Sequence, residues 1–166
     1  NENKTERKPY EHFDGMHIRF YEINGTFTNV QLTGDTLKTR ASLSAKERSG
    51  FAVKKMNAVM LWHTLGMEFT DLDLQTEKSR LGNVFAMKYS DFNHDMSDFI
   101  TQVRMQGNFI NSEIHSDDIA FFAPEMKTWN SKIFLSGKVR GTVDHLKGDA
   151  IIVKTGKETL LQGNFT

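Results

Sequence analysis

The chain has 166 residues, the length of one domain or of a part of one. Its 21 basic and 21 acidic residues balance, so the composition gives no indication of binding to nucleic acid or to an anionic membrane surface. The absence of cysteine excludes disulfides and zinc–thiolate sites but leaves the cellular compartment open. The sequence contains no run of 18 apolar residues, so it predicts no membrane-spanning helix.

The chain begins with a hydrophilic stretch and continues with glycine-punctuated runs of alternating residues. We expect residues 1–14 to form a polar tail and residues 15–166 to form a single β-rich segment of a larger protein. Two prolines and twelve glycines suit a strand-rich chain with glycine turns.

The first strands are expected to form hairpins. Asn24-Gly25 separates the strand-like runs Met16–Ile23 and Thr26–Thr33, and this dipeptide predicts a type I′ turn, in which both central residues need positive φ. Gly34-Asp35 predicts the next turn. The following residues, Thr36–Ala45, alternate strictly between apolar or small and polar side chains, which predicts a strand with one dry face.

Two of the next strands show a slip in this alternation. In Phe51–Trp62 the apolar positions change parity at Lys54-Lys55, and in Leu65–Leu74 they change parity at Thr70-Asp71. A slip of one residue between two alternating runs predicts a β-bulge. A helix over Phe51–Trp62 is the competing interpretation.

The middle of the chain is expected to hold one loop and one helix. Asp91–Asp98 predicts a polar loop, after which alternation resumes over Phe99–His115. Asp117–Met126 predicts a short helix capped by Ser116, because its two initial aspartates place negative charge at the positive end of the helix dipole. Pro124 limits this helix to about two turns.

The stretch from Ile133 to Gly148 carries the clearest pattern. Apolar or small residues occupy every second position for about 11 residues, which predicts a strand longer than the common 5–6 residues. Lys147-Gly148-Asp149 predicts a turn, and Ala150–Lys154 predicts the partner strand.

A sheet of such strands has to hide its dry face. It can close into a barrel, pack on a second sheet, or curl into a trough with an apolar interior. One short helix near 117–126 cannot cover it, so we expect a mainly β fold of long antiparallel, meandering strands that form a curled β-groove. The barrel and the sandwich stay open as alternatives.

No constellation of residues predicts catalysis, a cofactor or a metal. None of the six histidines has the i, i+4 partner of a metal-binding helix, and no Gly-x-Ser-x-Gly motif holds a nucleophile. The loop residues Asp91, Asp95 and Asp98 lack the glycine and spacing of a calcium loop. A hydrolase would have to use Asp91, His94 and Asp95. We therefore expect a protein that is not an enzyme.

The C-terminal third resembles a known family. The runs LSGKVRGTVDHLKG, AIIVKTG and TLLQGNF, and the DIAFFAPEM text before them, are similar to the repeating strands of the AsmA-like/TamB family of translocation and assembly module subunits, in its Bacteroidetes-type form. The resemblance extends over Asp71–Thr166 and, with less specific text, over Gly15–Thr70.

The resemblance implies a location and an activity. Members of this family are anchored in the inner membrane by an N-terminal helix and extend through the periplasm as a groove with an apolar lining. They are implicated in phospholipid movement to the outer membrane and in outer-membrane protein assembly with an Omp85-type barrel protein. This segment would be a periplasmic part of such a protein, and regions outside it would contact the barrel partner.

We therefore expect a non-enzymatic segment whose apolar groove shields the acyl chains of phospholipids. The alternative is a structural or adhesive β-domain with a filled core that binds a protein partner. Open strand edges would also allow self-association. The residues expected to line the groove are Val103, Met105, Phe109, Ile133, Leu135, Val139 and Val143, with Gly137 and Gly141 leaving room for ligand or for strand coiling.

The two interpretations predict different effects of Val139→Asp. In a lipid groove the substitution abolishes lipid retention and leaves the protein folded, because a charge replaces part of the apolar lining. In a filled core it severely lowers stability, and no lipid is present in either protein. Native mass spectrometry with organic extraction measures the lipid, and unchanged retention by folded variant would contradict the assignment of this face.

Overall fold

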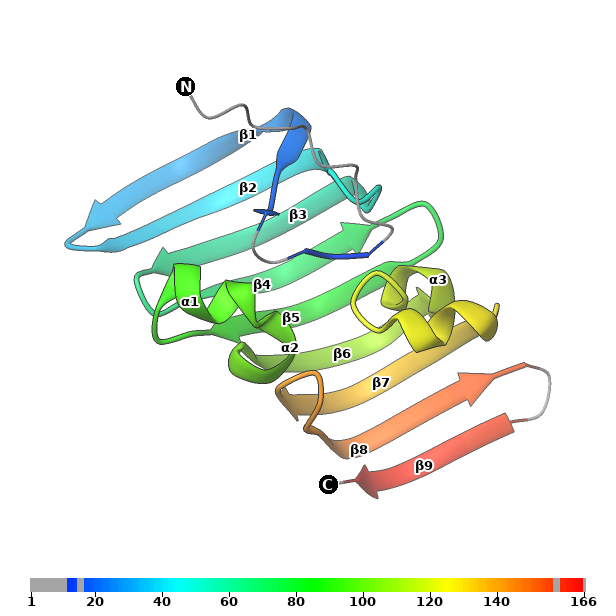
Figure 1. Ribbon diagram of the computed structural model, residues 1–166. Coiled ribbons are helices and arrows are strands. Elements are labelled where there is room, and N and C mark those ends of the chain that lie inside the picture. The colour runs from blue at the N-terminus through cyan, green and yellow to red at the C-terminus, as the bar shows by residue number, and fades with distance from the viewer. Residues whose placement is uncertain (1–11, 15–16, 157–158, 166) are drawn as a thin grey trace.

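The computed structural model describes residues 12–14, 17–156 and 159–165, and in them nine strands form a single antiparallel sheet (Figure 1). Each strand pairs with the next along the chain, so the sheet is an open meander that is not closed into a barrel. The mainly β prediction is thereby confirmed. The strands are β1 (Phe20–Thr33), β2 (Thr36–Glu47), β3 (Ala52–His63), β4 (Gly66–Gln75), β5 (Arg80–Lys88), β6 (Arg104–His115), β7 (Lys132–Gly141), β8 (Leu146–Thr155) and β9 (Thr159–Phe165).

Four short helices interrupt the meander at two places and lie over one face of the sheet (Figure 1). Between β5 and β6 the chain forms α1 (Phe92–Ser97) and α2 (Phe99–Gln102). Between β6 and β7 it forms α3 (Ser116–Ile119) and the 3-10 helix η2 (Pro124–Thr128). The two insertions therefore stand at opposite ends of the strands.

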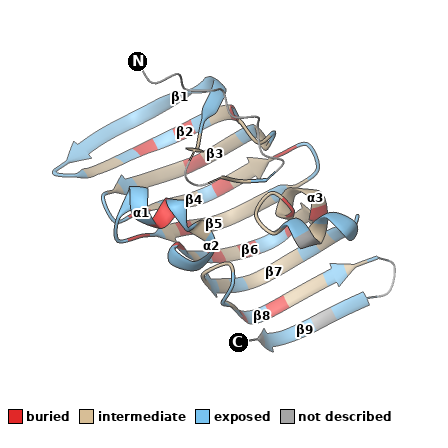
Figure 2. Ribbon diagram, viewed as in Figure 1, coloured by how far each residue is buried: buried red, intermediate tan, exposed pale blue. Residues whose placement is uncertain are grey.

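Strand β2 shows how alternation makes the two faces of the sheet different. Thr39, Ala41 and Ala45 are buried, whereas the intervening Lys38 and Arg40 are exposed. Side chains directly opposite each other on paired strands share a face, so pairing extends this difference across the sheet. We call the face that bears Ala41 the covered face and the opposite one the outer face, and Figure 2 shows the burial of each strand.

A small core joins the first helix insertion to the covered face. Tyr89, Met96 and Val103 form a buried cluster, and Met67 and Met87 of the sheet pack against it. These methionines lie opposite each other in the β4–β5 pair, which places them on one face. The insertion thus packs on the sheet through apolar contacts.

Both predicted bulges are confirmed. Lys54 and Lys55 together oppose Ser44, where the β2–β3 register shifts between Leu43 and Ala45. Thr70 and Asp71 oppose Val84 in the β4–β5 pair, and Asp71 has a φ of 51°. Each bulge restores apolar side chains to the covered face after a parity slip. The competing helix over Phe51–Trp62 is wrong, because β3 occupies Ala52–His63.

The predicted hairpin turn at Asn24-Gly25 is wrong, since β1 runs without interruption from Phe20 to Thr33. Gly25 pairs with Leu43, and a Cβ at Gly25 would lie 2.4 Å from the carbonyl oxygen of Ser42. This glycine allows a close approach of two strands and does not reverse the chain. The turn at Gly34-Asp35 is confirmed, and Gly34 has the positive φ of 60° that such turns use.

The predicted turn at Lys147-Gly148-Asp149 is also wrong, because these residues belong to β8. The chain reverses earlier, over Thr142–His145. Gly141, at the end of β7, has a φ of 129°, and a Cβ there would lie 2.1 Å from the carbonyl oxygen of His145. Only glycine fits this backbone, so the reversal begins at Gly141. The long strand consequently ends before Val143.

The loop predicted for Asp91–Asp98 is wrong, because α1 occupies most of it. The Asp91 side chain accepts a 2.7 Å hydrogen bond from the His94 backbone N–H and so caps the helix. The predicted strand over Phe99–His115 begins only at Arg104, since α2 takes the first residues.

The helix expected near 117–126 is present as two shorter pieces, α3 and η2, separated by residues 120–123. Pro124 cannot continue a preceding helix and instead starts the second piece. The cap predicted at Ser116 is wrong. His115 is the N-cap residue, and its ring nitrogen accepts a 3.2 Å hydrogen bond from the Asp117 N–H.

The cluster beneath α1 is expected to contribute measurably to stability. Met96→Ala should lower the free energy of unfolding by about 2–5 kcal/mol, because Met96 is 5% exposed and its removal leaves a cavity. Urea unfolding measures the change. Ile100→Ala, at a helix position that is 43% exposed, is the control and should cost much less. Equal costs for the two variants would contradict this role of the cluster.

Candidate functional site

The covered face contains most of the residues expected to line a groove. Met105 lies opposite Met87, Val139 lies opposite Gly107, and Phe109 lies opposite Gly137. Ile133 and Leu135 share the parity of Val139 on β7 and are half-buried like it. Two of the expected lining residues are not on strands. Val103 lies directly before β6 in the buried cluster, and Val143 lies in the turn after β7.

The glycines on β7 are surrounded by backbone. A Cβ at Gly137 would lie 2.5 Å from the carbonyl oxygen of Ala150, and the φ of Gly137 is 123°. A Cβ at Gly141 would meet the backbone of His145, in the turn that follows β7. The space beside Gly137 is thus taken by β8 and the space beside Gly141 by the turn.

Phenylalanine rings join the segments that lie over the covered face. The Phe13 ring lies 5.2 Å from that of Phe99 in α2 and 5.3 Å from that of Phe122, which follows α3. Phe122 also contacts Phe51 at 5.6 Å between ring centroids. The rings meet at edge-on or tilted angles, as is favourable for aromatic pairs. The N-terminal segment and both helix insertions are thereby joined into one cover over the sheet.

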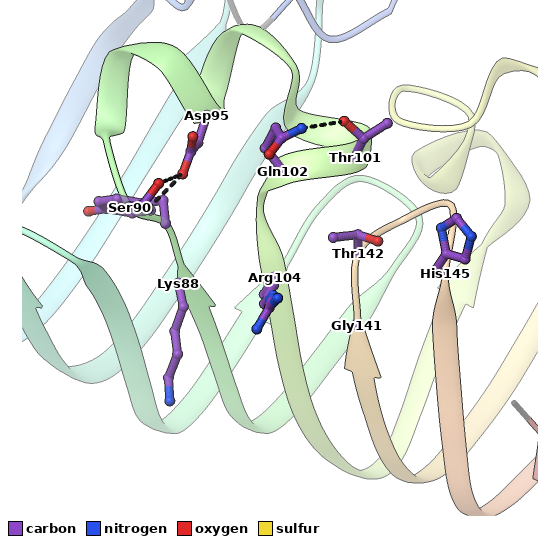
Figure 3. A pocket seen from close by; sticks show the side chains of 10 residues that line it. Lys88, Ser90, Asp95, Thr101, Gln102, Arg104, Gly141, Thr142 and His145 are labelled. Atoms are coloured by element: carbon purple, nitrogen blue, oxygen red, sulfur yellow. Dashed lines mark hydrogen bonds between the residues drawn. The ribbon is translucent and has the colours of Figure 1, made fainter.

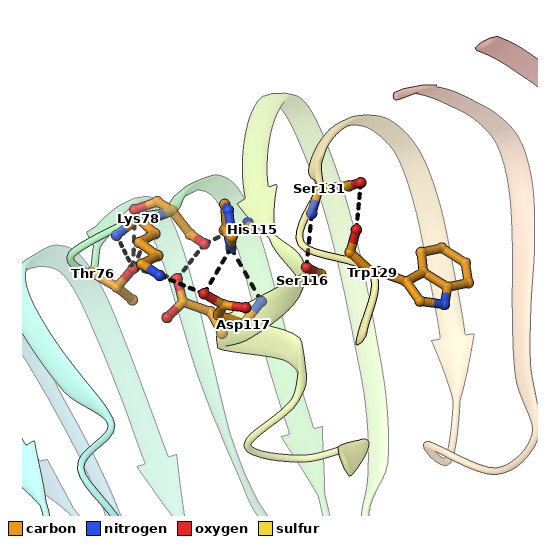
Figure 4. Close-up of polar contacts among 9 residues, drawn as sticks. Thr76, Lys78, His115, Ser116, Asp117, Trp129 and Ser131 are labelled. Atoms are coloured by element: carbon orange, nitrogen blue, oxygen red, sulfur yellow. Dashed lines mark hydrogen bonds and ion pairs between the residues drawn. The ribbon is translucent and has the colours of Figure 1, made fainter. Parts of the chain in front are cut away.

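Polar contacts fix the second insertion to the ends of the strands (Figure 4). The hydroxyl of Thr76 donates a 2.6 Å hydrogen bond to Asp118, and Lys78 forms an ion pair with Asp117. On the other side, the backbone of Ser131 exchanges hydrogen bonds with Ser116, whose side chain is fully buried. These bonds hold α3 between the β4–β5 turn and the start of β7.

The cover does not extend to the first strand. Phe27 pairs with Ala41 and Leu32 pairs with Leu37, so both lie on the covered face, yet they are 52% and 74% exposed. Phe20 lies opposite Glu47 on the same face and is 52% exposed. We call Phe20, Phe27 and Leu32 the β1 row. A row of large, exposed apolar side chains on an edge strand is typical of an interaction surface.

Sequence reasoning missed both parts of this site. Phe13 lies within the stretch predicted as a polar tail, although a lone phenylalanine there was a sign of packing. The β1 row was not predicted because the turn expected at Asn24-Gly25 divided the strand into two shorter ones. The slip in alternation after Tyr21 was the sign of a bulge, and the structure has one between Tyr21 and Asn24.

The acidic residues around α1 serve to hold the helix. The Asp95 carboxylate, which is 4% exposed, accepts hydrogen bonds from the backbone N–H of Ser90 at 2.6 Å and from the His94 ring at 3.0 Å. Asp91 caps the helix. Asp91, His94 and Asp95, the three residues that a hydrolase would use, thus form hydrogen bonds in and next to α1. Among the described residues, no group of three or more His, Asp or Glu side chains could hold a metal ion.

Comparisons with protein-family models, curated proteins and solved structures give no match to this chain. In the described part of the chain, no helix has the length and apolar character needed to cross a membrane.

The bond between His94 and Asp95 predicts a pH dependence of stability. Hydrogen bonds from His94 and from Ser90 hold the pKa of Asp95 well below its usual 3.8, and the bond to Asp95 raises the pKa of His94 above 6.5. The contribution of Asp95 is therefore lost as the pH falls below 3.8. That of His94 is lost as the pH rises above 6.5.

Asp95→Asn should consequently lower the thermal unfolding temperature more at about pH 5.5, where both contributions are present, than at about pH 8.5. Thermal unfolding of both proteins at the two pH values measures the difference. The His94→Gln variant keeps the hydrogen bond from Ser90 to Asp95. When Asp95→Asn is made in this variant, the change in unfolding temperature should depend on pH much less. A loss in Asp95→Asn that is independent of pH would contradict the charged pair.

Proposed function

We propose that the chain is a non-enzymatic segment of an apolar β-groove that shields lipid acyl chains, as the alternation of the strands and the resemblance to the AsmA-like/TamB family led us to expect. The observation that carries the proposal is the β1 row, an apolar part of the covered face that the helix insertions leave exposed. The acyl chain lies along this row, next to β2 and β3. Its setting would be the cell envelope, in phospholipid transport or outer-membrane protein assembly.

The edges of the sheet support this proposal. Among the described residues β1 pairs only with β2 and β9 only with β8, so in this part of the chain each edge strand has one unpaired side. Unpaired edges of this kind can accept further strands. Additional strands beyond β1, from the rest of a longer protein or from a second copy, would extend the covered face and enclose the β1 row in a continuous trough.

The hydrophobic effect is large enough for the proposed binding. Each methylene that leaves water contributes about 0.8 kcal/mol, so roughly ten methylenes along the β1 row would contribute about 8 kcal/mol before the entropy cost of binding. The aromatic side chains Phe20 and Phe27 supply broad apolar contact. Such contact does not select one acyl chain over another, which suits a conduit.

A second candidate function is favoured by the aromatic cover. Because the rings of Phe13, Phe99 and Phe122 contact one another in the segments that cover the sheet, the chain also fits a β-domain with a filled core. The β1 row would then bind an apolar segment of a protein partner. In this case lipid would not co-purify with the chain.

Two aspartate substitutions on β1 test the proposal. Phe27→Asp places a charge in the β1 row, whereas Thr28→Asp places the same charge on the outer face, opposite Arg40. Phe27→Asp should remove most co-purified or added phospholipid, because a charge on an apolar surface costs more than the contacts return. Thr28→Asp should retain lipid as the unsubstituted protein does. Native mass spectrometry with organic extraction, together with a fluorescent fatty-acid probe, measures binding.

Both variants should stay folded, since Phe27 and Thr28 are exposed, and circular dichroism verifies this. Equal lipid binding by the two folded variants would exclude the β1 row as the acyl site. Absence of lipid and of probe binding in the unsubstituted protein would overturn the lipid function and favour the protein-binding domain.

A further inference from the structure

On the outer face of β5–β8, basic residues lie directly opposite each other on paired strands. Lys88 at the end of β5 lies directly opposite Arg104 of β6, and Arg140 of β7 lies directly opposite Lys147 of β8. Side chains in such positions have Cβ atoms about 4.5–5.5 Å apart, and like charges there are destabilising. The two like-charged pairs occupy four adjacent strands.

Several other cations of the sheet are neutralised by carboxylates. Lys55 and Arg80 both pair with Asp73, and Lys46 pairs with Glu22 across the β1–β2 pair. By contrast, the side chains of Lys88 and Arg104 form no hydrogen bond or ion pair within the described part of the chain. Lysines and arginines that form such ion pairs include Arg40, Lys46, Lys54, Lys55, Lys78, Arg80 and Lys132.

The first like-charged pair borders a polar cavity of about 630 Å³ at the strand ends (Figure 3). Its wall is made by the end of β5, by α2 and the start of β6, and by the turn between β7 and β8. The other polar side chains that face it include Thr101, Gln102, Thr142 and His145. Residues from two separate connections, β5–β6 and β7–β8, thus surround one cavity together with the two cations.

Two carboxylates near the cavity, those of Asp95 and Asp144, are already engaged. Asp95 lines it, but its carboxylate accepts hydrogen bonds from the backbone and the hydroxyl of Ser90, at 2.6 and 3.0 Å. Asp144 accepts a 2.6 Å hydrogen bond from Thr142 and pairs with His145 at 2.8 Å. The ammonium of Lys88 and the guanidinium of Arg104 therefore remain as unengaged donors.

We propose that this cavity binds a phosphate-class dianion, held between Lys88 and Arg104. A guanidinium offers two parallel N–H donors to a tetrahedral oxyanion, and an ammonium adds a compact charge beside it. A single carboxylate would neutralise only one of the two cations, whereas a phosphomonoester or a pyrophosphate neutralises both. Arg140 and Lys147 extend the positive potential along the outer face and would attract the anion toward the cavity. The site is independent of the acyl-chain surface on β1.

Titration of the complete chain with pyrophosphate tests the site. Isothermal titration calorimetry at constant ionic strength separates specific binding from screening by salt. Lys88→Gln and Arg104→Gln should each weaken pyrophosphate binding by about tenfold or more, while Lys38→Gln should stay within about twofold of the unsubstituted protein. Lys38 is the matched control, since it also lies on an exposed outer-face position but opposite Leu61.

The source of the phosphate is distinguished by vesicles. Binding of phosphatidylglycerol vesicles in addition to pyrophosphate, with both lost in Arg104→Gln, would assign the site to lipid headgroups. Binding of pyrophosphate alone would assign it to a soluble phosphate compound. No pyrophosphate binding, or an equal loss in Lys38→Gln, would overturn the proposal.

A measurement without ligand tests the repulsion itself. In low-salt buffer Lys88→Gln should unfold at a higher temperature than the unsubstituted protein, and the gain should disappear at high salt. A gain that is absent at low salt would show that the two charges do not oppose each other, and would overturn the site.

Discussion

The structure depends on the burial of one apolar face of a sheet, against which no second sheet packs in the described part of the chain. All nine strands belong to one open meander, so the face that bears Ala41 and Met87 has to be covered by the connections between strands. The two helix insertions and the N-terminal segment provide this cover and meet through the rings of Phe13, Phe99 and Phe122. The contacts of these rings are therefore as much a part of the fold as the pairing of the strands.

Much of the strand pattern was predictable because alternation and bulges are local properties of the sequence. The parity slips at Lys54-Lys55 and Thr70-Asp71 each marked a bulge. A strand with a two-residue period changes parity where a bulge inserts one extra residue. The two turns that were predicted wrongly have a cause in common. Gly25 and Gly148 are glycines that fit inside strands, and which glycine reverses the chain depends on how closely the neighbouring strand approaches.

The candidate site was predictable only in part. Parity alone placed Met105, Phe109 and Val139 on the dry face of their strands, because that assignment needs no knowledge of distant contacts. The cover could not be predicted in the same way, since Phe13 and Phe122 are more than a hundred residues apart and only the folded chain brings their rings together. Asp91–Asp98 likewise looks like a loop until Asp91 is known to cap a helix.

The two surfaces available for binding lie on opposite faces and toward different parts of the meander. The β1 row is apolar and lies on the covered face at one edge, whereas Lys88 and Arg104 are on the outer face at the ends of the central strands β5 and β6. A ligand that needed both would have to span the thickness of the sheet, which no single small molecule on one face can do. The two surfaces are thus separate sites, and because neither shares a side chain with the other, substitution of Phe27 should leave anion binding intact and substitution of Arg104 should leave the β1 row intact.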